Sequence, residues 1–339
     1  FQNGKKNESI FALNNFVEKN PLDNIARYNL ALMQSETKNV ELAIKNYKKI
    51  IKNDSKHWKS KFNLYLLLID KKDFTNALLL IDDVLSINKD FQPALRDKAL
   101  VLINLKKPDI SLNYVLRSLK QNPADYIALN TLGIAYLELK KYPEAENIFK
   151  KAIEINSEYI SSYNNIGRCY SLQNKKNKAL KYFLKVLEKD HNYIDAINNI
   201  ANNYSESGEY NKSLDYYFRV LKLDKNNNEI LFNIGCAYVY LKDYKKAEKY
   251  YNKVIKDHQL YFESQKNIAI NKSFETNIEE AEKNLMLLLK IYKKNKDLLF
   301  AIANFYRSSK QFEKAIPYYS KIINDQNIDN EEKWPFLYL

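Results

Sequence analysis

A period of 34 residues runs through almost the whole sequence. Steps of 34 from Tyr126 in both directions mark nine successive segments between residues 24 and 329, with no insertion or deletion between them. The segments begin at Asn24, Trp58, Gln92, Tyr126, Ile160, Ile194, Asn228, Phe262 and Lys296. Each has the pattern of two helices joined by a short turn. Such a unit buries its apolar face only by stacking on its neighbours, so the period predicts a linear array of helix pairs.

Four columns of this repeat keep a similar side chain in most or all repeats. The eighth residue is small in every repeat except the second, and the twentieth is always Ala or Ser. The twenty-fourth is always bulky, as Phe149 illustrates, and the eleventh is Tyr in five repeats. Small residues on both helices let the two backbones approach, and the bulky residue fills the space beside them. We therefore expect Gly133 to serve close packing, although glycine inside a helix costs about 1 kcal/mol relative to alanine.

The composition fits an all-α chain. Only 5 Gly and 7 Pro occur among 339 residues, too few for a loop-rich or all-β protein, and 45% of the residues are hydrophobic. No run of 18 apolar residues is present, so no transmembrane segment is expected. Cys169 and Cys236 each lie in an apolar run and are expected to pack in the core.

The pattern resembles the tetratricopeptide repeat over about nine-tenths of the chain. The family's packing positions correspond to Leu132, Gly133, Tyr136, Ala145, Phe149 and Ala152, and its closing proline to Pro123. The resemblance implies an all-α, right-handed superhelical solenoid of antiparallel helix pairs.

The sequence departs from the family's pattern in several columns. The usual glycine at the end of the first helix survives only as Gly208. Most repeats have lysine there instead, at Lys38, Lys72, Lys106, Lys140, Lys242 and Lys310. Tyr65 replaces a small residue, and Lys98 and Lys272 occupy apolar columns. These exchanges make the local packing of the second, third and eighth repeats uncertain, but not the fold.

Both ends of the sequence fit partial repeats. Residues 1–23 match the second helix of a preceding repeat, and residues 330–339 match the start of a further repeat that is cut short. We expect the natural protein to extend further, and we expect uncovered helix faces at both ends to allow self-association. A cytoplasmic location is the working expectation.

Catalytic chemistry has little support in the sequence. His57, His191 and His258 fall in turns between repeats, and none has a Cys or acidic partner at metal-ligand spacing. There is no phosphate-binding glycine loop and no nucleophile elbow. We therefore expect no enzyme activity within these residues, no cofactor and no metal.

The sixth residue of each repeat is the strongest candidate for binding. In the family, first helices line a concave groove and this residue points into it. Asparagine recurs in the column, at Asn29, Asn63, Asn165, Asn199, Asn233 and Asn267. An amide donates and accepts hydrogen bonds together, which suits the backbone of an extended peptide. The column resembles the asparagine ladder in the helical arm of O-linked N-acetylglucosamine transferase, although asparagine is also the family's commonest residue there.

Further polar residues surround this column in the fourth to sixth repeats. They are Asn130, Asn164, Arg168, Asn198, Asn202 and Asn203. Arg168 is suited to pair with a carboxylate of a partner. The second residue of the last four repeats is acidic, at Asp195, Glu229, Glu263 and Asp297. These acids either give the groove a charge gradient or complement the helix dipole, and the dipole is the interpretation we favour.

The net charge of +13 is partly concentrated on the second helices. The twenty-sixth residue is basic in seven repeats, at Lys49, Arg117, Lys151, Lys185, Arg219, Lys253 and Lys321. A basic stripe attracts nucleic acid or an anionic membrane surface, but a charged exterior is also ordinary in a solenoid. We do not expect nucleic acid to be the partner.

The sequence therefore predicts a protein-interaction scaffold that binds a peptide or protein segment in its concave groove. One alternative is the substrate-recognition arm of a larger enzyme, of glycosyltransferase or sulfotransferase type, whose catalytic domain lies outside this segment. A weaker alternative is nucleic-acid binding through the basic stripe.

Overall fold

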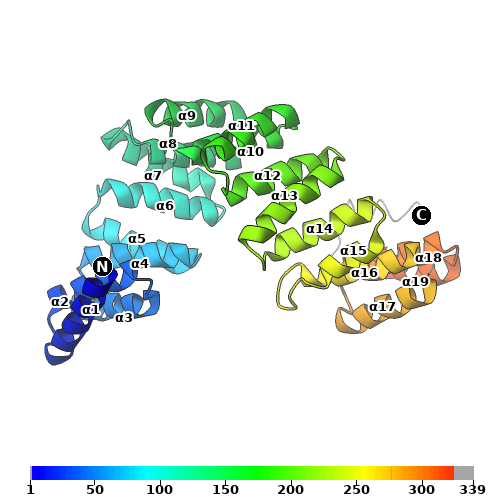
Figure 1. Ribbon diagram of the computed structural model, residues 1–339, viewed down its shortest axis with the longest axis horizontal. Helices are drawn as coiled ribbons and strands as arrows, with labels where there is room; N and C mark the ends of the chain where they lie inside the picture. Colours follow the sequence, from blue (N-terminus) through cyan, green and yellow to red (C-terminus); the bar gives the residue numbers. More distant parts are fainter. Residues whose placement is uncertain (1, 276, 324–339) are drawn as a thin grey trace. The chain divides into compact units, whose positions relative to one another are not determined.

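The computed structural model describes residues 2–275 and 277–323, with side chains from residue 6 onward. All regular secondary structure in these residues is α-helical (Figure 1). The chain divides into two compact units, residues 1–182 and 183–339, which we describe separately.

The first unit contains ten complete helices. They are α1 (Gln2–Lys19), α2 (Asn24–Glu36), α3 (Val40–Asn53), α4 (Trp58–Asp70), α5 (Phe74–Ile87), α6 (Gln92–Asn104), α7 (Pro108–Gln121), α8 (Tyr126–Glu138), α9 (Tyr142–Ile155) and α10 (Ile160–Leu172). The boundary between the units falls within α11 (Lys176–Lys189).

The described part of the second unit continues the alternation. Its helices are α12 (Ile194–Glu206), α13 (Tyr210–Leu223), α14 (Asn228–Tyr240), α15 (Tyr244–Tyr251), α16 (Tyr261–Phe274), α17 (Ile278–Ile291), α18 (Lys296–Ser308) and α19 (Phe312–Ile323).

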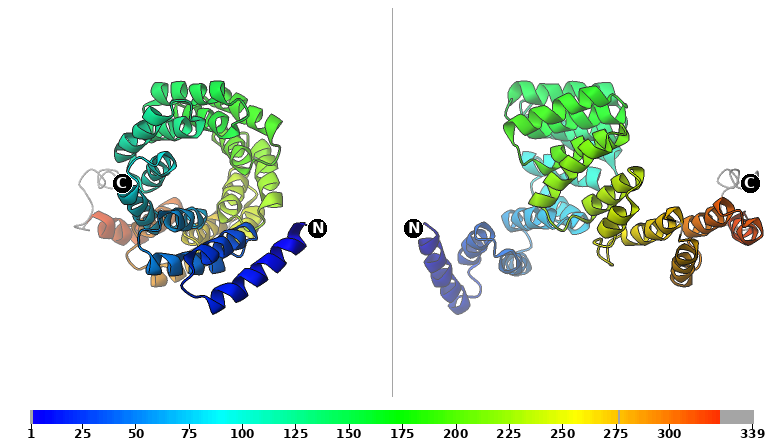
Figure 2. Two further views of the ribbon diagram at one scale, coloured as in Figure 1. Left: turned by 90° about the vertical axis from the view of Figure 1, so that its left-hand side faces the viewer. Right: turned by 45° about the vertical axis from the view of Figure 1, so that its right-hand side comes forward.

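Within each unit every helix packs against the next one in sequence (Figures 1 and 2). The first helix of a pair begins at the predicted repeat start in every case except α16, which begins one residue early, at Tyr261. First helices of adjacent pairs also contact each other, as α6 does with α8, α8 with α10, and α16 with α18. The first helices α6, α8 and α10 of the first unit, and α16 and α18 of the second, therefore lie side by side.

Helix α15 is shorter than the repeat pattern predicts. It ends at Tyr251 after 8 residues, whereas the second helices before and after it have 14. After Tyr251 the backbone N–H of Val254 bonds the carbonyl only three residues back, and the Ile255 N–H donates to the side-chain oxygen of Asn228 at 2.9 Å. The Asn228 side chain thus replaces a helical acceptor. This competition is typical of Asn near backbone donors.

The lysines that replace the family's glycine lie in the left-handed backbone region. Lys38, Lys72, Lys106, Lys140, Lys242 and Lys310 have φ between 58° and 62°. Asn174, with φ of 57°, and Gly208, with φ of 77°, lie in the same region. At Lys140 the amide bonds the Leu137 carbonyl at 2.9 Å, and the next amide, of Lys141, bonds the Tyr136 carbonyl at 2.8 Å. This is the Schellman arrangement that ends a helix. Each lysine therefore accepts a strained backbone so that the second helix can turn back on the first.

We expect Lys140→Gly to raise the free energy of unfolding by about 1 kcal/mol, because glycine adopts positive φ without a steric penalty. The matched control is Lys151→Gly in the interior of α9, which should lower stability by about 1 kcal/mol. Urea denaturation followed by circular dichroism measures both. A destabilised Lys140→Gly would contradict the assignment of strain to this turn.

The small eighth residue meets the bulky twenty-fourth residue in the helix pairs α8–α9 and α14–α15. A methyl group built on Gly133 would lie 2.4 Å from the ring of Phe149, and one on Gly235 would lie 2.5 Å from the ring of Tyr251. Both rings are almost completely buried. The glycines therefore provide room for an aromatic ring of the facing helix. This refines the expectation that they serve close approach between backbones.

The three exchanges that made local packing uncertain are each accommodated. Tyr65 is buried against Ala77 and Ile81, so a large eighth residue meets a smaller twenty-fourth one. The Lys98 ammonium lies 2.6 Å from an Asp82 carboxylate oxygen. Lys272 lies 2.7 Å from a Glu248 carboxylate oxygen, and hydrogen bonding to that carboxylate raises the pKa of Lys272. The sequence changes therefore keep the helix pairs intact.

We expect Gly133→Ala to lower the free energy of unfolding by about 1 to 2 kcal/mol, because the clash with Phe149 outweighs the gain in helix propensity. Phe149→Leu alone should also destabilise by leaving a cavity. The double variant recreates the Ala269 and Leu285 pair of the eighth repeat. Its loss should be smaller than the sum of the single losses. Strictly additive losses would show that the two positions do not share this space.

Candidate functional site

The sixth-residue column lies on the first helices, but its members differ in how accessible they are. In the first unit Asn29 is exposed, Asn63 is half-buried and Asn165 is buried, with 6% of its surface exposed. Asn63 donates from its amide nitrogen to the Tyr28 hydroxyl at 2.9 Å. The column is therefore not a uniform row of free amides.

Buried amides join α8 to α10. The Asn130 carboxamide oxygen accepts from the Asn165 amide at 3.0 Å and from the Ser162 hydroxyl at 3.1 Å. Asn165 in turn accepts from the Arg168 guanidinium at 3.3 Å. Asn164, beside them, is also buried. Asn130 and Asn165 thus satisfy each other between repeats, as buried polar groups must.

Arg168 is the accessible member of this group. Its side chain is 40% exposed, and its nearest acidic partner, Glu138, lies 3.9 Å away. The contact with Asn165 holds one edge of the guanidinium, while the group has five N–H donors in total. A carboxylate of a partner would therefore find donors at a positioned guanidinium.

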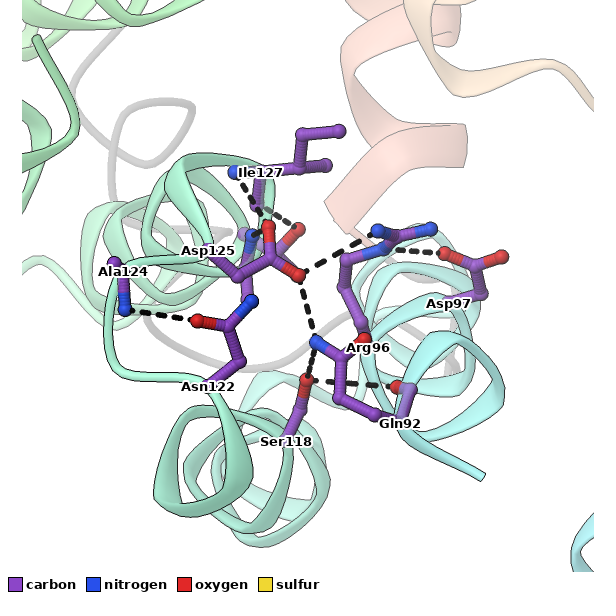
Figure 3. Close-up of polar contacts among 10 residues, drawn as sticks. Gln92, Arg96, Asp97, Ser118, Asn122, Ala124, Asp125 and Ile127 are labelled. Carbon is purple, nitrogen blue, oxygen red and sulfur yellow. Dashed lines mark hydrogen bonds and ion pairs between the residues drawn. The ribbon is translucent and has the colours of Figure 1, made fainter. Parts of the chain in front are cut away.

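In the third repeat the column holds an acid, Asp97, within a charged network (Figure 3). The Arg96 guanidinium lies 2.8 Å from Asp97 and 3.5 Å from Asp125. Asp125 also accepts from the Gln92 side-chain amide at 2.6 Å and from the backbone amides of Ile127 and Ala128. Asp125 therefore caps α8 and ties it to α6 at the same time.

Burial raises the pKa of Asp97, and the Arg96 charge only partly offsets this effect. The side chain is 13% exposed, so its ionised form is poorly solvated. In the folded chain this carboxyl takes up a proton at a higher pH than in the unfolded chain.

We expect the stability of the wild-type protein relative to Asp97→Asn to increase as the pH falls from about 7 to about 4. The folded state binds more protons than the unfolded state over this window, so the cost of ionising Asp97 is removed as it protonates. Urea midpoints of the two proteins at several pH values test this. Asp109→Asn, at an exposed acid of α7, is the control for general acid effects. A relative stability that falls with falling pH would contradict the raised pKa.

In the second unit several amides support buried tyrosines of the second helices. The Tyr217 hydroxyl donates to Asn202 at 2.6 Å, and Asn267 donates to the Tyr251 hydroxyl at 3.3 Å. The Tyr319 hydroxyl likewise donates to Asn304 at 2.9 Å. Asn202 and Asn304 occupy the ninth position of their repeats. Sequence reasoning named Asn202 as a contact residue but missed Asn304, although a polar residue in this column was a usable signal.

The other predicted residues of this unit are partly buried. Asn198, Asn199 and Asn233 are half-buried on α12 and α14. The carboxamide oxygen of Asn198 is buried without a hydrogen-bond partner among the described residues. Asn233 makes no side-chain contact to another polar group in the described chain.

A pocket of about 450 Å³ opens between α16 and α18. Its lining includes Ala301, the sixth residue of the ninth repeat, together with Phe300 and Phe305. The pocket therefore lies in the same surface as the asparagine column, at a repeat in which the asparagine is absent.

The four acids at the second positions of the last repeats lie in the first turns of their helices. Asp195, Glu229 and Asp297 are exposed, and Glu263 pairs with Lys266 at 2.6 Å. Their placement agrees with helix-dipole complementation.

Many side chains of the basic second-helix column contact neighbouring groups. Arg117 lies 3.2 Å from Asp90, and Arg219 donates to the His191 carbonyl at 3.0 Å. Lys253 and Lys321 lie over the rings of Tyr250 and Tyr318. These positive charges are thus held in place by cation–π and polar contacts within the repeats.

Among the residues that were placed, no cluster of three or more His, Cys, Asp and Glu side chains is arranged to hold a metal ion. His57 serves as the N-cap of α4, and burial raises the pKa of the Cys169 and Cys236 thiols. Neither thiol is therefore activated as a thiolate.

Four models of the tetratricopeptide repeat match the sequence. They cover residues 1–57, 127–190, 196–231, and both 229–256 and 296–324. Together these ranges exceed half of the chain. The chain belongs to the tetratricopeptide repeat family. The expected all-α solenoid of helix pairs is thereby confirmed. No curated protein matches the sequence.

Solved structures of tetratricopeptide repeat proteins and other solenoids share the fold. One match is a chain of the APC/C hetero-tetramer Cut9-Hcn1. The alignment covers 92% of the present chain and 75% of that chain, at 13% sequence identity and a TM-score of 0.58. A tetratricopeptide repeat protein from Parabacteroides merdae matches 77% of this chain and 99% of its own, at 16% identity and a TM-score of 0.58. At such low identity the likeness shows the fold alone.

Within the described residues, no helix has the length and apolar character needed to cross a membrane.

Proposed function

We propose that this tetratricopeptide repeat chain is a protein-interaction scaffold that binds an extended segment of a partner protein along its first helices. Family membership supports a scaffold role. The observation that carries the finer proposal is Arg168, a half-exposed guanidinium that Asn165 positions and that makes only a long ion pair, 3.9 Å, with Glu138. In a shared layer of first helices, such a group offers a partner carboxylate a bidentate contact.

The proposed contact residues are those predicted from the sequence. They are Asn29, Asn63, Asn130, Asn164, Asn165, Arg168, Asn198, Asn199, Asn202, Asn233 and Asn267. The hydrogen bonds in the structure suggest two roles within this set. Asn29 is exposed, and Arg168 and Asn233 are half-buried. All three have donors that would contact the partner. Asn130, Asn165, Asn202 and Asn267 bond other side chains and would hold the surface in shape.

An extended peptide suits this surface because its backbone has an N–H and a carbonyl at every residue. Asparagine can satisfy both kinds of group with one side chain. A row of first helices then binds the peptide backbone with little regard to sequence, and charged groups such as Arg168 select among partners.

The test compares a first-helix variant with a matched second-helix variant in affinity pull-downs from native lysate. The first-helix variant is Asn29→Ala, Arg168→Gln and Asn233→Ala, which removes accessible groups without cutting a buried amide pair. The control is Arg117→Gln, Lys151→Gln and Lys253→Gln. We expect the first-helix variant to lose a protein partner that the control retains, with an affinity at least about tenfold weaker.

Thermal unfolding of both variants within a few degrees of wild type would show that folding is intact. Equal recovery of all partners by the two variants would contradict the proposed site. A partner that is lost only in the second-helix variant, and is released by nuclease or moderate salt, would instead indicate nucleic-acid binding. A partner that becomes chemically modified by a catalytic domain on the same polypeptide would indicate a substrate-recognition arm.

A further inference from the structure

The pocket between α16 and α18 combines an apolar floor with a cation at its edge, Arg307, that has no ion-pair partner among the described residues. Ile270, Phe300 and Phe305 contribute to its lining, and Phe305 is only 4% exposed. Phe274, also in the lining, is 59% exposed and stacks on Tyr244 with ring centroids 5.5 Å apart. Its volume of about 450 Å³ lies within the range of sites that bind small ligands or anchor side chains.

The missing sixth-column amide accounts for the apolar character of this pocket. In the three preceding repeats the position holds Asn199, Asn233 and Asn267, whereas the ninth repeat has Ala301. The methyl group of Ala301 is smaller than an asparagine side chain and carries no polar atom. Phe300 and Phe305 line the pocket beside Ala301.

The charged groups around the pocket are unequal in their availability. Lys266 is already paired with Glu263 at 2.6 Å. Arg307, exposed at the other end of the lining, makes no side-chain hydrogen bond or ion pair within the described residues. The Asn304 oxygen accepts from Tyr319, so its amide hydrogens remain available. The donors Arg307 and Asn304 together favour a carboxylate beside the apolar recess.

The acidic residue of the pocket lining, Asp297, is far from Arg307 along α18. Asp297 lies ten residues before Arg307 on α18, which corresponds to about 15 Å along the helix axis. The Arg307 end of the pocket is therefore positive, and the Asp297 end is negative.

We propose that this pocket is an anchor subsite for an aromatic side chain of a bound protein segment, with an acidic residue close to the aromatic one in sequence pairing with Arg307. This rests on the proposed function of the first-helix surface and names the chemistry of its ligand. Aromatic rings in the recess would meet Phe300, Phe305 and Phe274 edge-on or in offset stacks, which such rings prefer. A buried aromatic anchor flanked by a charge pair is the usual composition of a binding hot spot.

The test is a selection of random heptapeptides displayed on phage against the full chain, repeated with Ala301→Leu and with Arg307→Gln. Ala301→Leu fills the recess with a good helix former, and Ala301→Ser controls for substitution at this position without filling it. We expect wild type and Ala301→Ser to select peptides with an aromatic residue and an acidic residue within about three positions, since an extended chain advances about 3.3 Å per residue. Ala301→Leu should lose this class of peptide.

A selected peptide, labelled with fluorescein, then gives affinities by anisotropy. Ala301→Leu should weaken binding at least about tenfold, as should Ala in place of the aromatic residue of the peptide. Arg307→Gln should weaken it about fivefold, but only when the acidic residue of the peptide is present. Identical peptides selected by wild type and Ala301→Leu, or no enrichment of aromatic and acidic residues, would overturn the assignment.

These outcomes are separable from those of the lysate experiment. Suppose that selection of aromatic peptides depends on Ala301, while the variant at Asn29, Arg168 and Asn233 keeps every partner. The anchor subsite is then supported, and the proposed function of the first-helix surface is contradicted. If that variant loses its partner while Ala301→Leu selects the same peptides as wild type, the longer surface stands and the subsite is overturned.

Discussion

The structure depends on the fit between a small residue in the first helix of a pair and a bulky residue in the second. Gly133 leaves room for Phe149 and Gly235 for Tyr251, and the contact is so close that a single added methyl group would overlap the ring. Where the first residue is large, as at Tyr65, the second is the smaller Ile81. In these pairs the size of one residue is matched to the space left by the other, as in any close-packed interior. Since each pair has a second apolar face, stacking on the next pair is required for burial.

This close packing brings polar atoms into contact with buried rings and helices, and those atoms need partners. The hydroxyls of Tyr217 and Tyr319 donate hydrogen bonds to Asn202 and Asn304. Asn165 donates a hydrogen bond to Asn130 of the adjacent repeat. An unpaired amide in such a place would cost about 1 to 3 kcal/mol, so these asparagines serve the fold first. The accessible groups that remain, among them Arg168 and Asn233, are the ones available to another molecule.

A solenoid of similar repeats has no single cleft in which a ligand must bind. Positions that depart from the repeat pattern are therefore informative about where a ligand binds. Ala301 is such a departure, because its column elsewhere holds mostly asparagine, and a pocket lies beside it. The lysines at left-handed turns are departures of another kind. They show that the turn geometry is imposed by the packing of the two helices even where the residue does not favour it.

The sequence by itself determined the architecture. A fixed period places equivalent residues in equivalent surroundings, so the size columns around Gly133 and Phe149 identified the helix pair, its partners and the family. It also placed the sixth-residue column on the first helices. It did not show that Asn165 is hydrogen-bonded to Asn130, that α15 ends at Tyr251, or that Ala301 borders a pocket. These features were decided by the tertiary structure alone. They depend on distances of a few ångströms between side chains of different helices, whereas periodicity specifies only which face of a helix each residue occupies.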